Sequence, residues 1–142
     1  VPLAKDQDLA ILPWSPLAGG FLSGKFTRDK EKAGGSRRDS FDFPPINKEK
    51  TYDIVDVISG IGKQYGVSPA QIALAWVRLQ PGVTSTIIGA RNIDQLNDNI
   101  KSTELQLSAG DLVKIDAVSA LTKEYPGWMT EYQSADRIKQ NS

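Results

Sequence analysis

Residues 84–92 read Thr84-Ser85-Thr86-Ile87-Ile88-Gly89-Ala90-Arg91-Asn92, a run of β-branched residues that ends at a glycine and leads directly into a helix start. Asn92 can cap this helix, and Gln95 stands three residues later in the capping-box position. Backbone N–H groups and the Arg91 guanidinium would then meet at one helix N-terminus, where the helix dipole favours an anion such as phosphate. The pattern therefore predicts a strand that leads into an anion site. An ordinary strand-to-helix turn with a solvated Arg91 is the alternative.

A second apolar run, Leu9-Ala10-Ile11-Leu12, ends at Pro13 near the start of the chain. It does not alternate between apolar and polar residues, which is typical of a strand buried on both faces of a parallel sheet, although a buried helix segment has the same pattern. Helical segments separate the two runs, so we expect parallel strands joined by a right-handed connection. Two strands cannot make a closed core, so the rest of the sheet is expected from another polypeptide segment or from residues outside this sequence.

Four helices are predicted from residues that can cap a helix N-terminus and from apolar residues at three- and four-residue steps. Their expected caps and ends are Asn47 and Gly66, Ser68 and Pro81, Asn92 and Ile100, and Ser108 with an apolar stripe as far as Leu121. Residues 1–8 are typical of the tail of a further helix. Trp76 is expected in the core rather than against a cofactor. Residues 125–128 are expected to form a packed turn, and residues 134–142 to fray.

The composition of the 142 residues excludes several kinds of site. Lys and Arg number 17, as do Asp and Glu, so no basic excess favours nucleic acid or anionic lipid, and no apolar run is long enough to span a membrane. Cysteine is absent, which excludes disulfides and thiolate metal sites and is compatible with a cytoplasmic protein. Histidine is also absent, so acid–base chemistry of this chain would have to use Asp, Glu, Lys, Tyr or Ser. The chain opens with Val1 and its sole methionine is Met129, so we expect a piece of a longer protein or a processed chain.

Residues 15–45 sustain neither a helical nor a strand period and are rich in glycine and basic residues. A loop of this length in a compact domain is usually either functional or disordered. Its composition suits a lid over an anionic ligand and is equally compatible with a mobile surface loop.

Three segments, taken together, resemble the aldo-keto reductases. Residues 12–26 (LPWSPLAGGFLSGKF) resemble the seventh strand and following loop of that family, residues 67–77 (VSPAQIALAWV) its seventh helix, and residues 88–99 (IGARNIDQLNDN) its eighth strand and cofactor helix. The branch that includes the potassium-channel β subunits and many bacterial reductases is most similar. The resemblance implies an α/β fold, a TIM (β/α)8 barrel of about 250 residues or more, of which this chain would supply strands 7 and 8 and the C-terminal helices. Residues 1–142 would be the C-terminal portion of one barrel, with a cofactor-side loop at 15–45 and a tail at 123–142.

The resemblance also implies which residues would bind NADP(H). The residues matched to the pyrophosphate are Ser15, Pro16 and Leu17, with Ala18 and Gly19 allowing close backbone approach. Lys25 would approach the phosphates, and Arg37, or equally Arg38, would fold over the cofactor. Gly89, Arg91 and Gln95 match the adenosine end, where Arg91 suits a 2′-phosphate, and Asp98 and Asn99 match contacts to the adenine. Each has a plainer alternative, such as a solvated Lys25 or a helix-surface carboxylate at Asp98.

The catalytic residues of the resembled family have no match in this chain. That family uses a tyrosine acid with a lysine, an aspartate and a histidine from earlier strands, whereas this chain has no histidine and no tyrosine at a strand end. We therefore expect the C-terminal, cofactor-binding portion of an NADP(H)-dependent oxidoreductase that reduces aldehydes or ketones by hydride transfer together with the missing N-terminal barrel portion. The alternatives are a non-catalytic nucleotide-binding or interaction module, and a marginal fold that survives only beside a complementary chain. Neither the carbonyl substrate nor the oligomeric state follows from the sequence.

Overall fold

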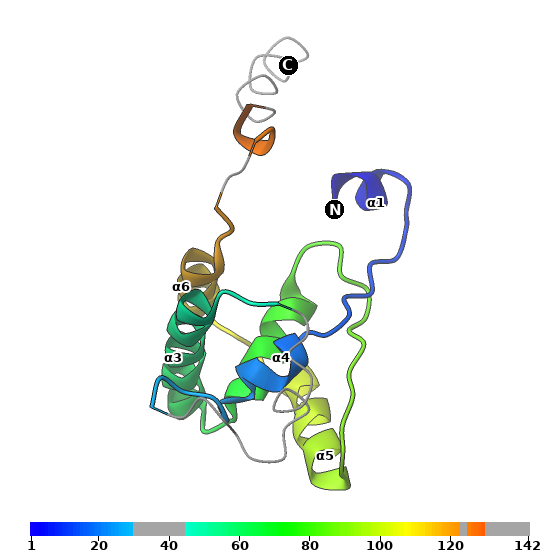
Figure 1. Ribbon diagram of the computed structural model, residues 1–142. Helices are drawn as coiled ribbons and strands as arrows, with labels where there is room; N and C mark the ends of the chain where they lie inside the picture. Colours follow the sequence, from blue (N-terminus) through cyan, green and yellow to red (C-terminus); the bar gives the residue numbers. More distant parts are fainter. Residues whose placement is uncertain (30–44, 123–124, 130–142) are drawn as a thin grey trace.

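The computed structural model describes residues 1–29, 45–122 and 125–129, and it places a group of packed helices beside two extended segments (Figure 1). The elements, in chain order, are α1 (Pro2–Asp6), the 3-10 helix η1 (Ala18–Ser23), α3 (Lys48–Tyr65), α4 (Pro69–Leu79), α5 (Ile93–Lys101), the 3-10 helix η2 (Ser102–Glu104) and α6 (Ala109–Ser119). The predicted ligand Arg37, its alternative Arg38 and most of the predicted tail lie outside the described residues. Within the described ranges, no helix has both the length and the apolar character that crossing a bilayer requires.

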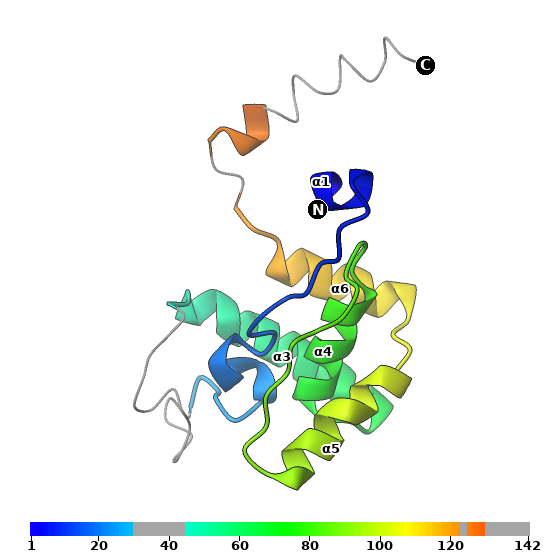
Figure 2. The same cartoon turned by 90° about the vertical axis from the view of Figure 1, so that its right-hand side faces the viewer.

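The two apolar runs lie side by side, as Figures 1 and 2 both show. Ile11 and Val83 form a parallel bridge, and the N–H of Thr84 donates to the carbonyl of Ile11 at 2.9 Å. Further along, the N–H of Ile87 donates to the carbonyl of Pro13 at 3.1 Å. The parallel direction agrees with the sequence, but in the described part of the chain these contacts make an isolated bridge and no continuous strand at 9–12 or 84–88. A two-segment pair with no further strand beside it has few ladder hydrogen bonds, which accounts for this difference.

Capping side chains fix where the main helices begin. Each cap accepts a hydrogen bond from the backbone N–H three residues later. The four bonds run from Lys50 to Asn47 at 3.1 Å, from Gln71 to Ser68 at 3.2 Å, from Gln95 to Asn92 at 2.9 Å and from Asp111 to Ser108 at 3.2 Å. The predicted starts of α3, α4, α5 and α6 are therefore confirmed, as is the end of α3 at Gly66, which has a φ of 67°.

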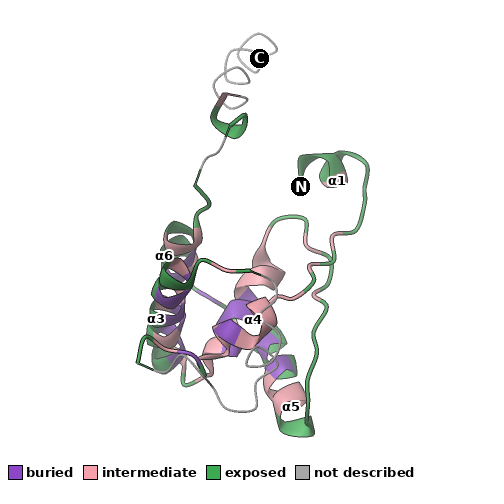
Figure 3. Cartoon of the chain, in the orientation of Figure 1, coloured by how far each residue is buried: buried purple, intermediate pink, exposed green. Residues whose placement is uncertain are grey.

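Helices α3, α4 and α6 enclose the main core. α3 packs against both α4 and α6, and α4 also contacts α5, η1 and η2. Figure 3 shows the buried residues where α3 and α4 face their neighbours. The buried apolar members of this core are Ile58, Ile61, Ile72, Ala73, Ala75, Leu107 and Ile115. Trp76 packs beside them, and its indole N–H donates to Asp116 at 2.7 Å, so it belongs to the core edge as predicted.

A smaller aromatic cluster fastens η1 to α3. The rings of Phe21 and Phe26 stack with their centroids 4.8 Å apart, and the ring of Tyr52 on α3 lies 5.2 Å from that of Phe21. All three rings are buried, together with Val55. The segment predicted to have no regular structure therefore contains a short helix held by packing. Its glycines hide any period in the sequence, and the helix forms because the two phenylalanines bury against α3.

Two sequence predictions about the C-terminal part are wrong. Leu121 lies beyond the end of α6 and is 89% exposed, so the apolar stripe stops before it. Tyr125 and Trp128 are 74% and 51% exposed, so their turn is not packed. In both cases an apolar side chain has no neighbouring element among the described residues to pack against.

The extended pair carries an uncovered apolar surface. Leu9, Leu12 and Ile87 are between 48% and 58% exposed, and Trp14 is 61% exposed. Figure 3 shows exposed and half-exposed residues along both segments, in contrast to the helix group. The core therefore lies wholly on the helical side of the pair.

Candidate functional site

The two predicted ligand loops leave the same end of the extended pair. The N–H of Ile87 bonds to the carbonyl of Pro13, and each loop begins two residues beyond this contact, at Ser15 and at Gly89. Because the two segments are parallel, both loops start at their carboxyl ends. This is the edge at which sheets of parallel strands bind their ligands.

The first loop has an unusual backbone. Ser15 and Ala18 have φ values of 54° and 49°, and Gly19 and Gly20 follow at 67° and 95°. The Ser15 hydroxyl accepts a hydrogen bond from the N–H of Gly19 at 3.2 Å, and the Ser15 carbonyl accepts one from the N–H of Ala18 at 2.9 Å. A non-glycine residue in this conformation costs about 1–3 kcal/mol and is typical of functional sites. This turn therefore lies in the stretch that the resemblance matches to the pyrophosphate.

The remaining predicted ligands of this loop lie around the same turn. Pro16 and Leu17 are half-buried, and Leu17 packs against the main core. Lys25 is exposed just beyond η1. Gly24, between η1 and Lys25, has a φ of 79°, and a Cβ placed on it would come within 2.8 Å of Cγ of Pro69. The loop therefore rests closely on the N-terminus of α4.

The second loop is closed by side chains of α5. Asn92 accepts from the N–H of Gln95 at 2.9 Å, and the Gln95 side-chain oxygen accepts from the N–H of Arg91 at 3.1 Å. The Gln95 side chain therefore bonds to the backbone of Arg91, the residue before the cap, rather than to the backbone of the cap Asn92 as in an ordinary capping box. The amide of buried Asn99 donates to the carbonyl of Gly89 at 3.5 Å, the long limit of a hydrogen bond. Gly89, Arg91, Gln95 and Asn99 are brought together, with the Arg91 side chain exposed at the helix start.

Asp98 faces a different neighbour. One carboxylate oxygen accepts from the Ser68 hydroxyl at 2.7 Å, and the other accepts from the side-chain amide of Gln71 at 2.6 Å. Both partners belong to the start of α4. The sequence identifies Ser68 and Gln71 only as a helix cap and the residue three positions after it. No local signal links them to Asp98, which lies in the next helix, 27 residues after Gln71. The contact of Asp98 with adenine stays a prediction.

A charged cluster close to η1 also escapes the sequence analysis. Arg28 bonds to Glu49 and Asp53 and lies within 3.7 Å of Asp56, while its guanidinium carbon is 5.6 Å from the centroid of the Tyr52 ring. The hydrogen bond that Arg28 donates to Glu49 raises the pKa of Arg28 above its usual range. The three carboxylates are spaced four and three residues apart, so they lie on one face of α3. This spacing is the sequence signal that could have revealed the cluster. These residues are exposed, so the cluster fastens the loop to α3 only weakly.

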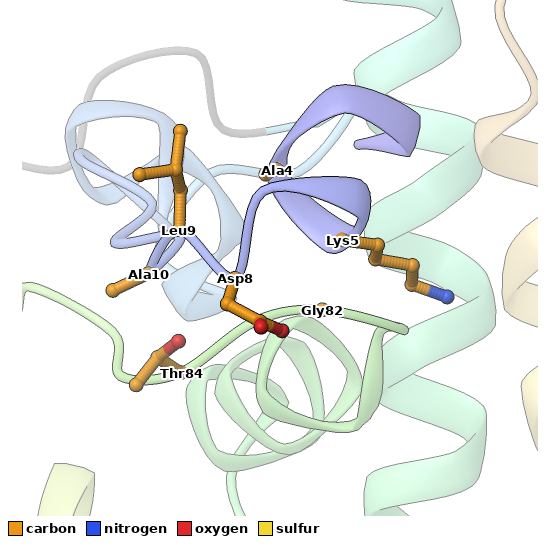
Figure 4. Close-up of a pocket in the computed structure, with 7 residues that line it drawn as sticks. All are labelled: Ala4, Lys5, Asp8, Leu9, Ala10, Gly82 and Thr84. Carbon is orange, nitrogen blue, oxygen red and sulfur yellow. The ribbon is translucent and has the colours of Figure 1, made fainter.

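An open depression of about 400 Å³ lies at the other end of the extended pair (Figure 4). It is lined by Ala4, Lys5, Asp8, Leu9, Ala10, Gly82 and Thr84. None of these residues was predicted to bind a ligand, and all precede the two loops along their respective segments. Among the described residues, no group of three or more metal-binding side chains comes together. The candidate site is therefore the loop edge and not this depression.

A match to a family model identifies the family of this chain. The aldo/keto reductase family model matches residues 1–120. The chain belongs to the aldo/keto reductase family. The resemblance drawn from the sequence is therefore confirmed at the level of the family, whose fold is the TIM barrel.

Three curated relatives illustrate the aldo/keto reductase match. The chain is 38% identical to Protein tas of Escherichia coli over 112 residues, which cover 79% of this chain and 32% of the relative. It is 39% identical to the uncharacterized oxidoreductase YrpG of Bacillus subtilis, over 75% of this chain and 31% of that protein. It is 35% identical to a probable aldo-keto reductase of Glycine max, over 81% of this chain and 33% of that protein. The chain thus spans about a third of the length of these relatives, two of which are named as an oxidoreductase or an aldo-keto reductase.

Proposed function

We propose that this chain is the C-terminal, cofactor-binding portion of an NADP(H)-dependent oxidoreductase that reduces aldehydes or ketones by hydride transfer. In this proposal residues 9–12 and 84–88 are strands 7 and 8 of a TIM barrel. The observation that carries the proposal is the common origin of the two loops at the carboxyl end of the parallel pair. Phosphate sites of such barrels are formed by the loops after strands 7 and 8.

The residues of the two loops fit the groups of such a cofactor. The left-handed turn at Ser15 and Gly19 offers close backbone approach, and the exposed Lys25 offers a positive charge. We propose that the pyrophosphate is bound by Ser15, Pro16, Leu17 and Gly19, that Lys25 approaches the phosphates, and that Arg37, or equally Arg38, folds over the cofactor. The exposed guanidinium of Arg91 stands at the start of α5, where a 2′-phosphate can receive bidentate charge-assisted bonds and the favourable end of the helix dipole. Gly89, Gln95 and Asn99 complete the proposed adenosine end. Asp98, which the resemblance matches to the adenine contact, belongs to the same helix and bonds to Ser68 and Gln71.

This chain would bind and orient the cofactor, and the cofactor would supply the hydride. The protein groups that hold the carbonyl and donate its proton are proposed to come from the N-terminal barrel portion, because no histidine occurs in these 142 residues. The role proposed for this chain is therefore to position the cofactor rather than to transfer a proton.

The proposal is tested by comparing NADPH and NADH as ligands of the wild-type chain and of Arg91→Ala, with binding measured by titration calorimetry. Loss of charge-assisted bonds to the 2′-phosphate should weaken NADPH binding about tenfold to a hundredfold, while NADH binding should change little. Lys101→Ala is the matched control, since Lys101 is an exposed cation at the opposite end of α5. Equal losses for both dinucleotides, or for both variants, would count against the assigned role of Arg91.

A non-catalytic nucleotide-binding or interaction module is the second candidate. It is favoured by the absence of histidine and by a relative from Schizosaccharomyces pombe that is named as a putative voltage-gated potassium channel subunit beta, to which the chain is 34% identical over 130 residues. The discriminating assay is NADPH oxidation with a panel of aldehydes, run on this chain alone and with the N-terminal portion of its parent. Turnover that requires both polypeptides supports the reductase. Nucleotide binding without turnover in the pair supports the module.

A further inference from the structure

We propose that the first turn of α4, residues 68–71, is the platform on which both halves of the nucleotide site rest, and that Asp98 is the positioning residue that locks α5 to it. This inference rests on the function proposed above. It assigns Asp98 a role through α4 instead of a direct contact with the nucleotide.

The lock consists of two short hydrogen bonds between α4 and α5. The hydroxyl of Ser68 donates to one oxygen of Asp98 at 2.7 Å, and the side-chain amide of Gln71 donates to the other at 2.6 Å. The same Ser68 hydroxyl accepts from the N–H of Gln71 at 3.2 Å as the cap of α4. Gln71 is only 6% exposed, so its amide would be left unsatisfied if Asp98 moved away. The position of Asp98 is thus fixed from two directions.

The other half of the site touches the same turn. A Cβ placed on Gly24 would lie 2.8 Å from Cγ of Pro69, so the end of η1 packs directly against the first residue of α4. Gly24 immediately precedes Lys25, and η1 begins at Ala18, within the left-handed turn. The end of η1 and helix α5 therefore both contact the first turn of α4.

The turn itself is held firmly by the core. The N–H of Val67 donates to the carbonyl of Gly62 at 2.9 Å, and a Cβ on Gly62 would lie 2.7 Å from the carbonyl oxygen of Val67. Ile72, the next residue after the turn, is fully buried. A platform anchored in this way can transmit its position to both loops.

Asp98 is well placed to pass this position to the second loop. It lies three residues after Gln95 and directly before Asn99, whose side chains hold the N–H of Arg91 and the carbonyl of Gly89. A carboxylate on a helix that is proposed to bind a phosphate would repel its ligand if it faced that ligand. The two donors of α4 hold the charge on the α4 side of the helix instead.

The test compares Asp98→Ala and Asp98→Asn with Asp116→Ala in this chain. Asp116 accepts one side-chain hydrogen bond from Trp76 on α4 at 2.7 Å, so its removal also loosens a helix contact of α4, but away from the loops. Two quantities are measured: amide hydrogen exchange of residues 84–101, and the affinity for 2′,5′-ADP, which contains only the adenosine end. Asp98→Ala should accelerate exchange and weaken 2′,5′-ADP binding, each about tenfold. Asp98→Asn keeps one acceptor and should fall between it and the wild type, and Asp116→Ala should change neither quantity in this segment.

Each other outcome contradicts part of the account. Weaker binding by Asp98→Ala with unchanged exchange would mean that Asp98 contacts the nucleotide directly, which overturns the positioning role. Equal effects of Asp116→Ala would mean general destabilisation, which overturns it too. If the wild type binds no 2′,5′-ADP, the proposed function fails, and the exchange comparison still decides whether Asp98 holds α5.

Discussion

Asp111, in the first turn of α6, shows what the structure adds to a helix start that the sequence predicts. The Ser108 cap and the position of Asp111 in the first turn of α6 follow from the sequence, and the structure adds the Tyr65 hydroxyl, which donates to Asp111 at 2.9 Å. The Ser108 hydroxyl donates to the same carboxylate at 2.6 Å, and Lys114 lies at 3.4 Å. The hydrogen bonds from Ser108 and then Tyr65 lower the pKa of Asp111 below its ordinary value of 3.8. Sequence spacing does not reveal this contact, because Tyr65 and Asp111 lie on two different helices.

Substitution of Asp111 should make stability depend on pH in a defined direction. A folded-state pKa below the unfolded value stabilises the fold above the unfolded pKa, and this contribution is lost as the pH falls through the folded value. Asp111→Asn should therefore lower the free energy of unfolding at pH 7 by about 1–3 kcal/mol. The difference from the wild type should shrink as the pH drops below about 4. Urea denaturation followed by circular dichroism measures it.

Glu104→Gln is the control for this substitution. Glu104 is an exposed carboxylate in η2, and its replacement should change the free energy of unfolding by less than about 0.5 kcal/mol. A difference between Asp111→Asn and the wild type that stays constant from pH 7 to pH 2 would rule out the linkage.

Helices and their boundaries were predictable because each depends on neighbouring residues. A cap and a period of three or four residues are visible in the sequence, and α3, α4, α5 and α6 begin where Asn47, Ser68, Asn92 and Ser108 stand. The 3-10 helix η1 was not predictable, since its backbone passes through left-handed positions that glycine permits and aromatic packing fixes. The extended pair was predicted as strands and forms only a bridge, because a strand requires neighbours that the described part of this chain does not provide.

The contact between η1 and α4 makes Gly24 a sensitive position. Its left-handed backbone and the closeness of Pro69 both disfavour a side chain, so Gly24→Ala should lower the free energy of unfolding by about 1–3 kcal/mol. Gly60 is the matched control: it lies inside α3, and a Cβ there meets nothing within 4 Å. Gly60→Ala should raise the free energy by about 0.5–1 kcal/mol. Thermal denaturation of the two variants measures both changes in the free energy of unfolding. An unchanged free energy for Gly24→Ala would contradict the close packing of η1 on α4.

At the scale of the whole molecule, the chain has a packed helical side and an uncovered extended side. The site loops leave the carboxyl end of the extended pair, whereas the open depression lies at its other end. Four of the predicted ligands, Gly89, Arg91, Gln95 and Asn99, are gathered by α5, and Ser15 and Gly19 by the first loop. The sequence suggested these groups through the family resemblance. It did not reveal that the first turn of α4 contacts both the end of η1 and α5, because these contacts join residues far apart in the chain.

The central claim, that the two loops form one nucleotide site, is tested most directly by mapping hydrogen exchange across the chain with and without saturating NADPH. The account predicts that NADPH slows exchange in residues 15–25 and in residues 87–99 together, while the depression around Lys5 and Gly82 is unaffected. Slowed exchange in only one loop, slowed exchange around the depression, or no change at all would contradict it.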